Sequence, residues 1–274
     1  MKDKDIIISC EKILKGKIVR IQDLSIGCDQ KVYLIQIDNK KYIYKESKKD
    51  ISKIKNEEYA LNILSNLEIP IPKLIYTDNG FLIESYIDGD LLSKKVSENL
   101  FIQLGYYISK IHSVKVEGFG EIKNNKGEYQ TESEYLFSWL NLNNSNHKIL
   151  KNFNFKQIFE ENLDLLKSEN SYFLHGDISC SNTIVYDNKI NGIIDFGDAI
   201  CGVIEYDLGL FYIKIENEKN WNSFLKGYNK EFNEKKFNLY VIAFGIWMIQ
   251  DGIINENDFH FQKFINTVNK FNIA

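Results

Sequence analysis

The chain has little of several features that would assign a protein to a class at once. Only two of its 274 residues are proline and four are cysteine. No two cysteines form a Cys-x-x-Cys pair, which argues against a zinc site or a disulfide framework. No apolar run approaches the roughly 18 residues of a membrane span, and the start is too briefly apolar for a signal peptide. We therefore expect a cytoplasmic protein that does not contact the membrane.

A strong charge of either sign is also missing. The net charge is −4 at pH 7, whereas nucleic-acid binders are usually strongly basic. The acidic excess lies in the second half of the chain, which suits a cationic small ligand. No Walker A loop, His-Glu-x-x-His helix or Gly-x-Ser-x-Gly elbow occurs, which argues against P-loop kinases, zinc proteases and serine hydrolases.

Strand patterns dominate the first 88 residues, and helix patterns dominate the remainder. Apolar alternation and turn residues predict hairpins at 31–46, 73–87 and 183–195. Helical spacing predicts helices at 51–67, 97–113, 132–142, 155–168 and from about 205 onward. We therefore predict an α+β fold with a small β-rich lobe at 1–88, a larger helical lobe at 89–274 and a hinge near 84–90.

The polar residues of "FLHGDISCSN" (173–182) and "IIDFG" (193–197) stand where apolar strands end. Asp177 begins a loop that Asn182 closes, and the following hairpin should return Asp195 to the neighbourhood of Asn182. An amide and a carboxylate oxygen side by side suit Mg²⁺. Asp177 is then left to accept a proton from an attacking hydroxyl, an arrangement used in phosphoryl transfer. We expect His175 to hold the loop through its ring.

These two motifs resemble the catalytic and metal motifs of the aminoglycoside phosphotransferases and their choline kinase-like relatives. The resemblance covers most of the chain, since "IGCDQKVYLI" is similar to the family's phosphate-covering loop, "YIYK" to its lysine strand and "FLIESYIDGD" to its hinge. It implies the two-lobed protein-kinase-like fold and a kinase dependent on Mg²⁺ and ATP, with GTP also possible. Asp177 would be catalytic, and Asn182 and Asp195 would bind the metal.

The resemblance also implies a set of nucleotide-binding residues. Lys45 ends a strand and would contact the α- and β-phosphates. Its carboxylate partner would be Glu57 or Glu58, and Glu57 is favoured because it shares the core face of its helix. The remaining positions would act through their backbone, on the phosphates at Gly27 and Cys28 and on adenine at Ser85 and Ile87.

The acceptor is the least defined part of the prediction. The leading class is an aminoglycoside antibiotic, a polycation that would need acidic contacts, and we predict Asp198, Glu160 and Asp164 as candidates. A metabolite kinase of the same fold, acting on choline, methylthioribose or a fructosamine, is the alternative. A non-catalytic nucleotide-binding regulator is a third hypothesis, and the intact set of Lys45 and Asp177 with both metal ligands disfavours it.

Overall fold

A computed structural model describes residues 3–25, 30–47, 50–78, 80–143 and 147–271. The chain divides into two compact units, the first made of Met1–Lys94 with Asn182–Asp198 and the second of Lys95–Ser181 with Ala199–Ala274. This division joins the predicted hairpin at 183–195 to the first unit, and the predicted lobe boundary at 88/89 stays a prediction. The predicted α+β class is confirmed, because a β-rich N-terminal sheet precedes a mainly helical part.

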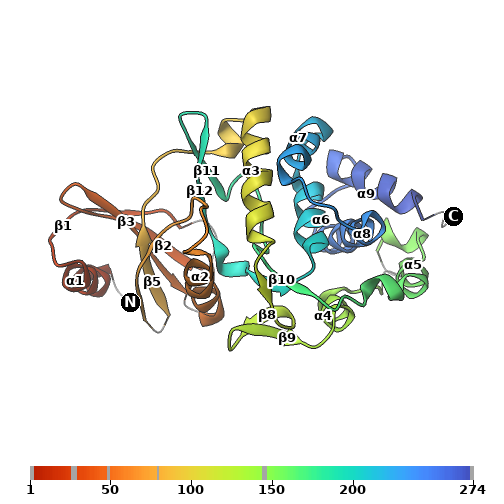
Figure 1. The fold of residues 1–274 in the computed structure, drawn as a ribbon, viewed down its shortest axis with the longest axis horizontal. Coiled ribbons are helices and arrows are strands. Elements are labelled where there is room, and N and C mark those ends of the chain that lie inside the picture. Colours follow the sequence, from red (N-terminus) through yellow and green to blue (C-terminus); the bar gives the residue numbers. More distant parts are fainter. Residues whose placement is uncertain (1–2, 26–29, 48–49, 79, 144–146, 272–274) are drawn as a thin grey trace. The chain divides into compact units, whose positions relative to one another are not determined.

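A five-stranded antiparallel sheet in the order β1-β2-β3-β5-β4 forms the first unit's centre (Figure 1). Its strands are β1 (Ile18–Asp23), β2 (Gln30–Ile37), β3 (Lys40–Ser47), β4 (Leu74–Asp78) and β5 (Phe81–Ser85). Its helices are α1 (Asp3–Leu14) and α2 (Ile51–Leu64). The two hairpins and α2 were predicted from the sequence, whereas α1 was not.

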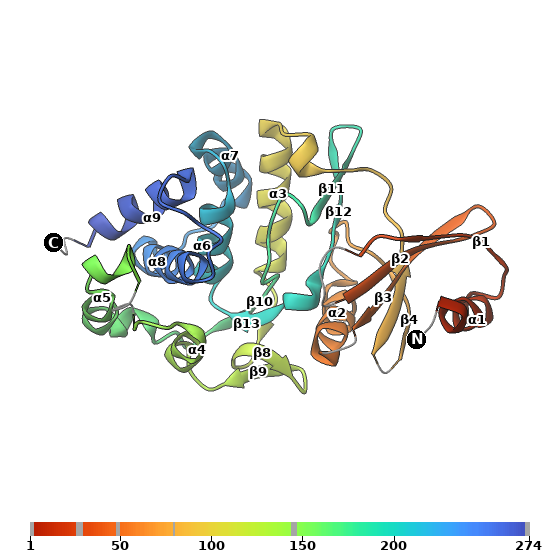
Figure 2. The ribbon, with the colours of Figure 1, turned by 180° about the vertical axis from the view of Figure 1, so that it is seen from behind.

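The two faces of this sheet are covered differently because successive side chains alternate between them. Tyr33 and Tyr44 pack with Ile6 of α1 in one buried apolar cluster. Lys45 and Glu84 lie on the opposite face, where α2 contacts β3 and β5. Both views show α1 and α2 on opposite sides of the sheet (Figures 1 and 2). The first face is therefore apolar, and the second carries buried charge.

A smaller sheet in the order β12-β11-β6 completes the first unit. It consists of β6 (Asp90–Leu91), β11 (Thr183–Tyr186) and β12 (Lys189–Ile193), with short 3₁₀ turns η1 (Leu92–Lys94) and η4 (Phe196–Asp198). Asp187 and Asn188 connect β11 to β12 with φ of 48° and 57°. Two successive positive φ values define the tight turn that suits antiparallel strands, and Asp and Asn adopt them readily. The predicted hairpin is thus confirmed.

Helices predominate in the second unit. They are α3 (Glu98–Ile111), α4 (Glu132–Trp139), α5 (Phe155–Glu161), α6 (Ile204–Lys214), α7 (Glu218–Tyr228), α8 (Glu234–Gln250) and α9 (Phe259–Asn269), with 3₁₀ turns η2 (Leu150–Asn152) and η3 (Leu163–Leu166). The predicted helix at 155–168 ends early. The side-chain amide of Asn162 donates to the carbonyl of Ile158 at 2.7 Å. It thereby uses a carbonyl that a backbone N–H would otherwise bond if the helix continued.

A second five-stranded sheet, in the order β7-β10-β13-β8-β9, lies beside these helices. Its strands are β7 (Lys115–Val116), β8 (Phe119–Lys123), β9 (Lys126–Tyr129), β10 (Ser171–Leu174) and β13 (Ile200–Gly202). The sequence predicted the strand that ends before His175, which is β10, whereas the other strands are too short to leave a clear alternation and were not predicted. The sheet matters for function because β10 leads directly into the His-Gly-Asp loop.

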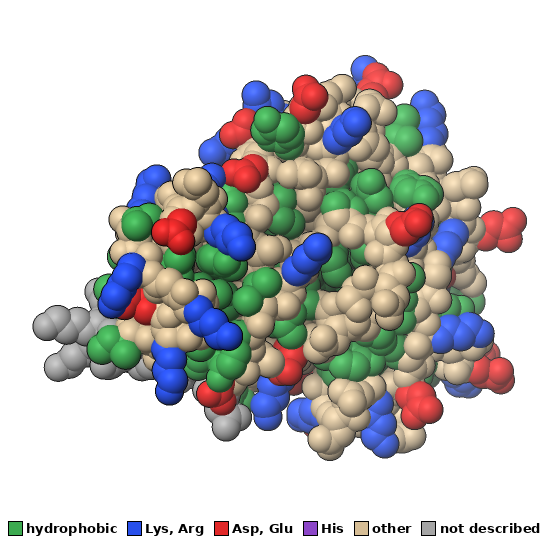
Figure 3. All heavy atoms as spheres, turned by 60° about the vertical axis from the view of Figure 1, so that its left-hand side comes forward, with side chains coloured by type: hydrophobic (Ala, Val, Ile, Leu, Met, Phe, Trp, Pro, Cys, Tyr) green, Lys and Arg blue, Asp and Glu red, His purple; other side chains and the backbone are tan. Residues whose placement is uncertain are grey.

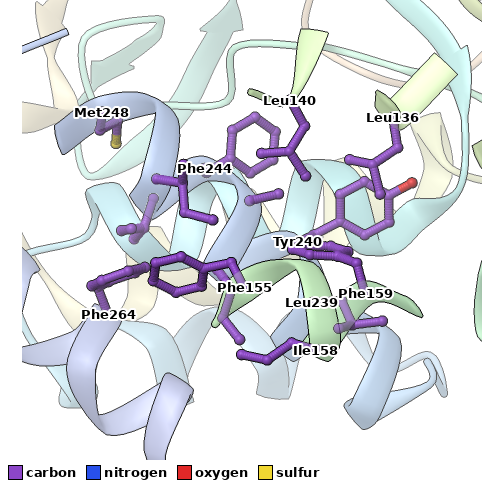
Figure 4. Packing of buried hydrophobic residues seen from close by; sticks show 14 of the residues in the cluster. Leu136, Leu140, Phe155, Ile158, Phe159, Leu239, Tyr240, Phe244, Met248 and Phe264 are labelled. Carbon is purple, nitrogen blue, oxygen red and sulfur yellow. The ribbon is translucent and has the colours of Figure 1, made fainter. Parts of the chain in front are cut away.

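The second unit's apolar core forms where α4, α5, α8 and α9 meet. In Figure 4, Phe264 of α9 lies beside Phe155 of α5, and Leu136 of α4 lies near Tyr240 of α8; all four are at most 2% exposed. Close packing of this kind holds the surrounding helices in fixed positions.

On the face shown in Figure 3, acidic and basic side chains are interspersed. None of the helices in the described part of the chain combines the length and apolar character needed to span a bilayer.

Candidate active site

Lys45 lies at the centre of a buried charged cluster in the first unit. Its ammonium group pairs with the carboxylate of Glu57 and lies 3.2 Å from that of Glu84. The three residues are 5%, 0% and 2% exposed. Glu58, the other predicted partner, instead accepts a hydrogen bond from Thr77 at 3.3 Å. The helix face favoured from the sequence is therefore the one that meets Lys45.

The strand register explains why Glu84 joins this cluster. Lys45 pairs with Leu82 and Ile43 pairs with Glu84, so that Lys45 and Glu84 share one face of the sheet. Sequence reasoning assigned no role to Glu84. The available signal was an acidic residue inside the apolar strand "FLIES", since a buried carboxylate needs a cation or a proton.

The cluster contains more acid than base. Burial lowers the pKa of Lys45, but the charges of Glu57 and Glu84 outweigh burial and raise it overall, so the lysine is always charged. Burial raises the pKa of Glu57 to about 8, and burial also raises that of Glu84. One ammonium group cannot balance two carboxylates, so burial favours the protonated form of one of these two acids.

Asn182 and Asp195 lie at adjacent ends of the β11–β12 hairpin. The N–H of Ile194 donates to the carbonyl of Asn182 at 3.0 Å. Asp195 has a φ of 68°, in the left-handed region that few non-glycine residues occupy. Its carboxylate makes no hydrogen bond or ion pair with any other described residue. Side chains in such backbone conformations are concentrated at functional sites.

The segment after Asp195 is fixed to α2. Asn56 donates to the carbonyl of Gly197 at 3.1 Å, and Lys53 pairs with Asp198 at 3.1 Å. The helix that supplies Glu57 to Lys45 therefore also holds the turn that follows Asp195. One helix thus positions two of the predicted nucleotide-binding elements.

The oxygen donors of Asn182 and Asp195 fit Mg²⁺. This ion prefers hard oxygen ligands, keeps several waters and commonly takes only one or two protein carboxylates. Within the described residues there is no group of three or more His, Cys, Asp or Glu side chains that could enclose a metal. A sparse site completed by phosphate and water oxygens agrees with this donor set.

The second unit holds the loop that contains Asp177. The backbone N–H groups of His175 and Gly176 donate to the buried carboxylate of Asp207 at 2.8 and 2.9 Å. His112 contacts the same carboxylate through Nε2 at 3.0 Å. The N–H of Asp177 donates to Nδ1 of His175 at 3.3 Å, so this ring does hold the loop as predicted. Asp207 and His112 were missed, although an acid inside the apolar "YDLGLF" was a signal.

The carboxylate of Asp177 pairs with Lys214 at the end of α6. The two side chains are 34% and 27% exposed, so this pair is accessible to solvent. Sequence reasoning did not find Lys214, because nothing in a single sequence joins residues 37 positions apart. The lysine fixes the direction of the carboxylate while leaving part of it open.

The other predicted nucleotide contacts are of two kinds. Gly27 and Cys28 lie outside the described residues. The N–H of Ser85 donates a hydrogen bond to the backbone carbonyl of Lys73 at 2.9 Å, so it is not available to bond adenine. The N–H of Ile87 makes no hydrogen bond within the described chain and remains available to a ligand.

Each of the three predicted acceptor contacts has a lysine partner. The pairs are Asp198 with Lys53 at 3.1 Å, Glu160 with Lys156 at 3.6 Å and Asp164 with Lys167 at 2.6 Å. The charge of a different carboxylate, that of Glu216, acts on the loop that contains Asp177. The pKa of Cys180 is raised to about 11, first by burial and then by the charge of Glu216, and no ion pair within the described residues involves Glu216.

Solved structures with this fold were found by comparison. The streptomycin–ATP ternary complex of APH(2")-IIa has a TM-score of 0.68 at 22% identity and covers 92% of this chain and 93% of its own. ADP-bound APH(2'')-Ib has a TM-score of 0.61 at 23% identity, with coverage of 98% and 96%. A putative fructosamine-3-kinase from Thermobifida fusca has a TM-score of 0.70 at 12% identity, with coverage of 97% and 98%. At these identities the likeness shows the fold.

No curated protein matches the sequence. The model of the phosphotransferase enzyme family (APH) matches residues 20–239, which include Lys45, Asp177, Asn182 and Asp195. That match covers most of the chain and agrees with the protein-kinase-like fold. The protein therefore belongs to the phosphotransferase enzyme family and is a small-molecule phosphotransferase.

Proposed function

We propose that the protein transfers the γ-phosphate of ATP to a hydroxyl group of a small molecule, with an aminoglycoside-type antibiotic as the leading acceptor class. The observation that carries this proposal is the buried pair of Lys45 and Glu57. A charge pair in a sheet interior costs desolvation energy that an apolar pair would avoid. A lysine on the third strand and a glutamate on the following helix are the pair that protein kinases need for phosphoryl transfer.

The first unit would bind the nucleotide. Lys45 would contact the α- and β-phosphates, and Glu57 would keep its ammonium group in position. The N–H of Ile87 would donate a hydrogen bond to the base, and the carbonyl of Ser85 would accept one from it. Gly27 and Cys28 would cover the phosphates through their backbone. Backbone contacts discriminate weakly between purines, so GTP stays a possible donor.

Asn182 and Asp195 would hold Mg²⁺ through their side-chain oxygens. When bound, the ion neutralises charge on the phosphates. Within the chain, the hairpin keeps these two residues adjacent and α2 holds the turn beyond them. The carboxylate of Asp195 brings the full negative charge, so it should contribute more to metal affinity than the amide of Asn182.

Asp177 would accept the proton of the attacking hydroxyl. Its loop is held by Asp207 and His175, and its carboxylate is oriented by Lys214. A positioned base contributes about 10²- to 10⁴-fold to the rate of such a reaction.

A cationic acceptor is supported by Glu216, whose charge acts on Cys180 in the loop that follows Asp177. Asp198, Glu160 and Asp164 remain candidates, but the lysine partner of each reduces the charge that it can offer. Related folds have been solved with streptomycin and with hygromycin B. These names motivate the aminoglycoside class for this protein.

A metabolite kinase is the second candidate, favoured by the likeness to a putative fructosamine-3-kinase. A neutral or weakly charged acceptor would also be compatible with the paired acids. The non-catalytic regulator is disfavoured, because the residues that a silent relative typically lacks are all present here.

The decisive experiment is a coupled ADP-release assay with a panel of acceptors. The panel would contain aminoglycosides of the kanamycin and gentamicin types, choline, methylthioribose and a fructosamine, with the Asp177→Asn variant as the matched control. We expect turnover with an aminoglycoside and reduced drug toxicity in a susceptible bacterium that expresses the protein. Turnover with a metabolite alone would replace the antibiotic proposal, and ATP binding without turnover on any acceptor would favour the regulator.

A further inference from the structure

Helix α6 ends at Lys214, whose ammonium group pairs with the carboxylate of Asp177. Like any α-helix, it ends with backbone carbonyls that no N–H of the same helix can reach. The carbonyl of Phe211 accepts from the N–H of Ile215 at 2.9 Å, but the carbonyls after it need partners from elsewhere. The direction of Lys214 depends on how these carbonyls are held, because they belong to the residues on either side of it.

Helix α9 supplies these partners. Nζ of Lys263 donates to the carbonyl of Tyr212 at 2.9 Å and to that of Ile215 at 2.7 Å. Nδ1 of His260 lies 2.6 Å from the carbonyl of Ile213, and this nitrogen carries the proton because a carbonyl only accepts. Both views place α9 beside α6 (Figures 1 and 2). The backbone before and after the last residue of α6 is thus bound to a second helix.

Lys263 is buried without an acidic partner. It is 4% exposed, and within the described residues no carboxylate forms an ion pair with it. Burial lowers its pKa to about 8, an effect that the charge of Glu218 partly offsets, so the ammonium form predominates at pH 7. Its Nζ lies 4.3 Å from the ring centre of Tyr212 and 5.1 Å from that of Phe259, and such ring faces attract a cation.

This burial is costly, because a charge loses its hydration when it leaves water. The bonds to two carbonyls and the contacts with two rings offset that cost. An apolar side chain would avoid it altogether if packing α9 against α6 were the only requirement. The charge is therefore explained by what it holds, which is the end of α6.

Lys270, just after the end of α9, provides a contrast. Its Nζ donates to the side chain of Asn238 in α8 at 3.2 Å. Within the described chain it makes no hydrogen bond with α6. The two lysines thus leave the same helical segment toward different neighbours, and only Lys263 reaches the backbone around Lys214.

We propose that Lys263 is a positioning residue for phosphoryl transfer, which fixes the carbonyls around Lys214 and so sets the direction of the ammonium group that orients Asp177. His260 holds the carbonyl that lies between the two that Lys263 binds. The contacts run from α9 through the end of α6 to the His-Gly-Asp loop, and all of them lie within the second unit. The inference rests on the proposed role of Asp177 as the base.

Competitive acetylation of the full chain tests this positioning without any acceptor. Dilute acetic anhydride modifies neutral amines, so a lysine paired with a carboxylate reacts slowly, and peptide mass spectrometry gives the rate at Lys214. The variant Asp177→Asn sets the rate for Lys214 without its carboxylate partner. We expect Lys263→Met to raise the rate at Lys214 toward that value, by at least about threefold, since a weaker ion pair lowers the pKa of the lysine. Lys270→Met should leave it unchanged.

Two further variants separate positioning from packing. Lys263→Arg keeps a cation with several donors, so it should restore most of the protection of Lys214. His260→Phe removes only the donor to Ile213 and should raise the acetylation rate in the same direction by less. It also provides the test if Lys263→Met does not fold.

Single-turnover phosphoryl transfer gives the second readout, with the acceptor found by the panel. Lys263→Met should lower the rate by about tenfold, as expected when a reacting group is misplaced, and leave the dissociation constant for ATP unchanged. A role in stability alone would lower the free energy of unfolding but change neither this rate nor the acetylation of Lys214 in the folded enzyme.

Several results would overturn the positioning role. They are an unchanged acetylation rate of Lys214 in Lys263→Met, or in His260→Phe where the first variant does not fold, an equal rise in Lys270→Met, and an unchanged rate of phosphoryl transfer in Lys263→Met. Failure of the proposed function would look different. In that case Asp177→Asn itself would transfer phosphate at the wild-type rate, whatever the acetylation of Lys214.

Discussion

Lys45 and Lys214 each hold a carboxylate that the proposed reaction needs, but their surroundings are opposite. Lys45 is 5% exposed and faces two buried acids, whereas the side chain of Lys214 is 27% exposed and faces Asp177 alone. A buried group is held in one geometry, and a solvent-exposed pair can separate at low cost. The buried cluster of Lys45, Glu57 and Glu84 therefore keeps its side chains in fixed positions. The exposed pair of Asp177 and Lys214 would leave the carboxylate accessible to a substrate in the proposed reaction.

The largest expected effect is a difference in protein stability between variants of these two lysines. Lys45→Met leaves Glu57 and Glu84 buried without a cation, so we expect it to lower the free energy of unfolding by about 3–5 kcal/mol at pH 8. Lys214→Met breaks an exposed pair and should cost about 1 kcal/mol or less. Urea unfolding of both variants measures the difference. Equal losses would show that the two pairs are not energetically distinct.

A second test concerns the metal ligands. Asp195→Asn should weaken Mn²⁺ binding in the presence of ADP by at least about tenfold, the lower end of what loss of a metal-supporting group costs. Asn182→Ala should lose less, because it removes no charge. Electron paramagnetic resonance of free Mn²⁺ reports binding without turnover, and Asp198→Asn is the control. If Asp195→Asn and Asn182→Ala both bind Mn²⁺ like the wild type, the hairpin does not form the metal site.

The excess acid around Lys45 predicts a pH dependence of stability. Burial raises the pKa of Glu57 from 4.5 to about 8, so the folded chain binds more protons than the unfolded chain between these values. The free energy of unfolding should therefore fall as pH rises through this window, by on the order of 1 kcal/mol per pH unit. Glu84→Gln removes a charge that raises this pKa and should flatten the slope.

Glu58→Gln serves as the control for that slope, because Glu58 neighbours the cluster without joining it. Denaturation at a series of pH values gives the comparison. Two results would contradict the raised pKa of Glu57. One is a wild-type free energy of unfolding that rises from pH 5 to pH 8, and the other is the same pH dependence of stability in Glu84→Gln as in the wild type.

The smallest expected effect lies at the acceptor. If the acceptor is cationic, Glu216→Gln should raise its KM by up to about fivefold, equivalent to 1 kcal/mol for a partly exposed pair, and less at high salt. Glu160→Gln, whose charge is already paired with Lys156, should change the KM less. The ATP KM should be unaffected in both. A larger effect at Glu160 would move the acceptor site toward α5.

The sequence predicted those parts of the fold that local patterns determine. Alternation and turn residues were enough for the β2–β3 and β11–β12 hairpins, and helical spacing was enough to favour Glu57 over Glu58 as the partner of Lys45. At the start of the helix predicted at 97–113, the side chain of Ser97 accepts a hydrogen bond from the N–H of Leu100. In each case the signal and the structure lie within a few residues of one another.

The features of the structure that the sequence did not predict depend on contacts between residues far apart in the chain. Glu84 joins Lys45 because of a strand register, and Lys214 meets Asp177 because α6 runs along the loop. The short strands of the second sheet have too few residues to show a period. Lysine partners on the surface, such as Lys53 for Asp198, were equally invisible, and they weaken a prediction made from acidic residues alone.

The most direct test of the central claim is the rate of phosphoryl transfer in Asp177→Asn. The measurement is a single turnover with saturating Mg²⁺ and ATP and the acceptor found by the panel, together with the dissociation constant for ATP. We predict a rate lower by about 10²-fold or more, as expected for loss of a positioned base, with ATP affinity unchanged. A rate close to that of the wild type would contradict the account, because Asp177 would then not be the base.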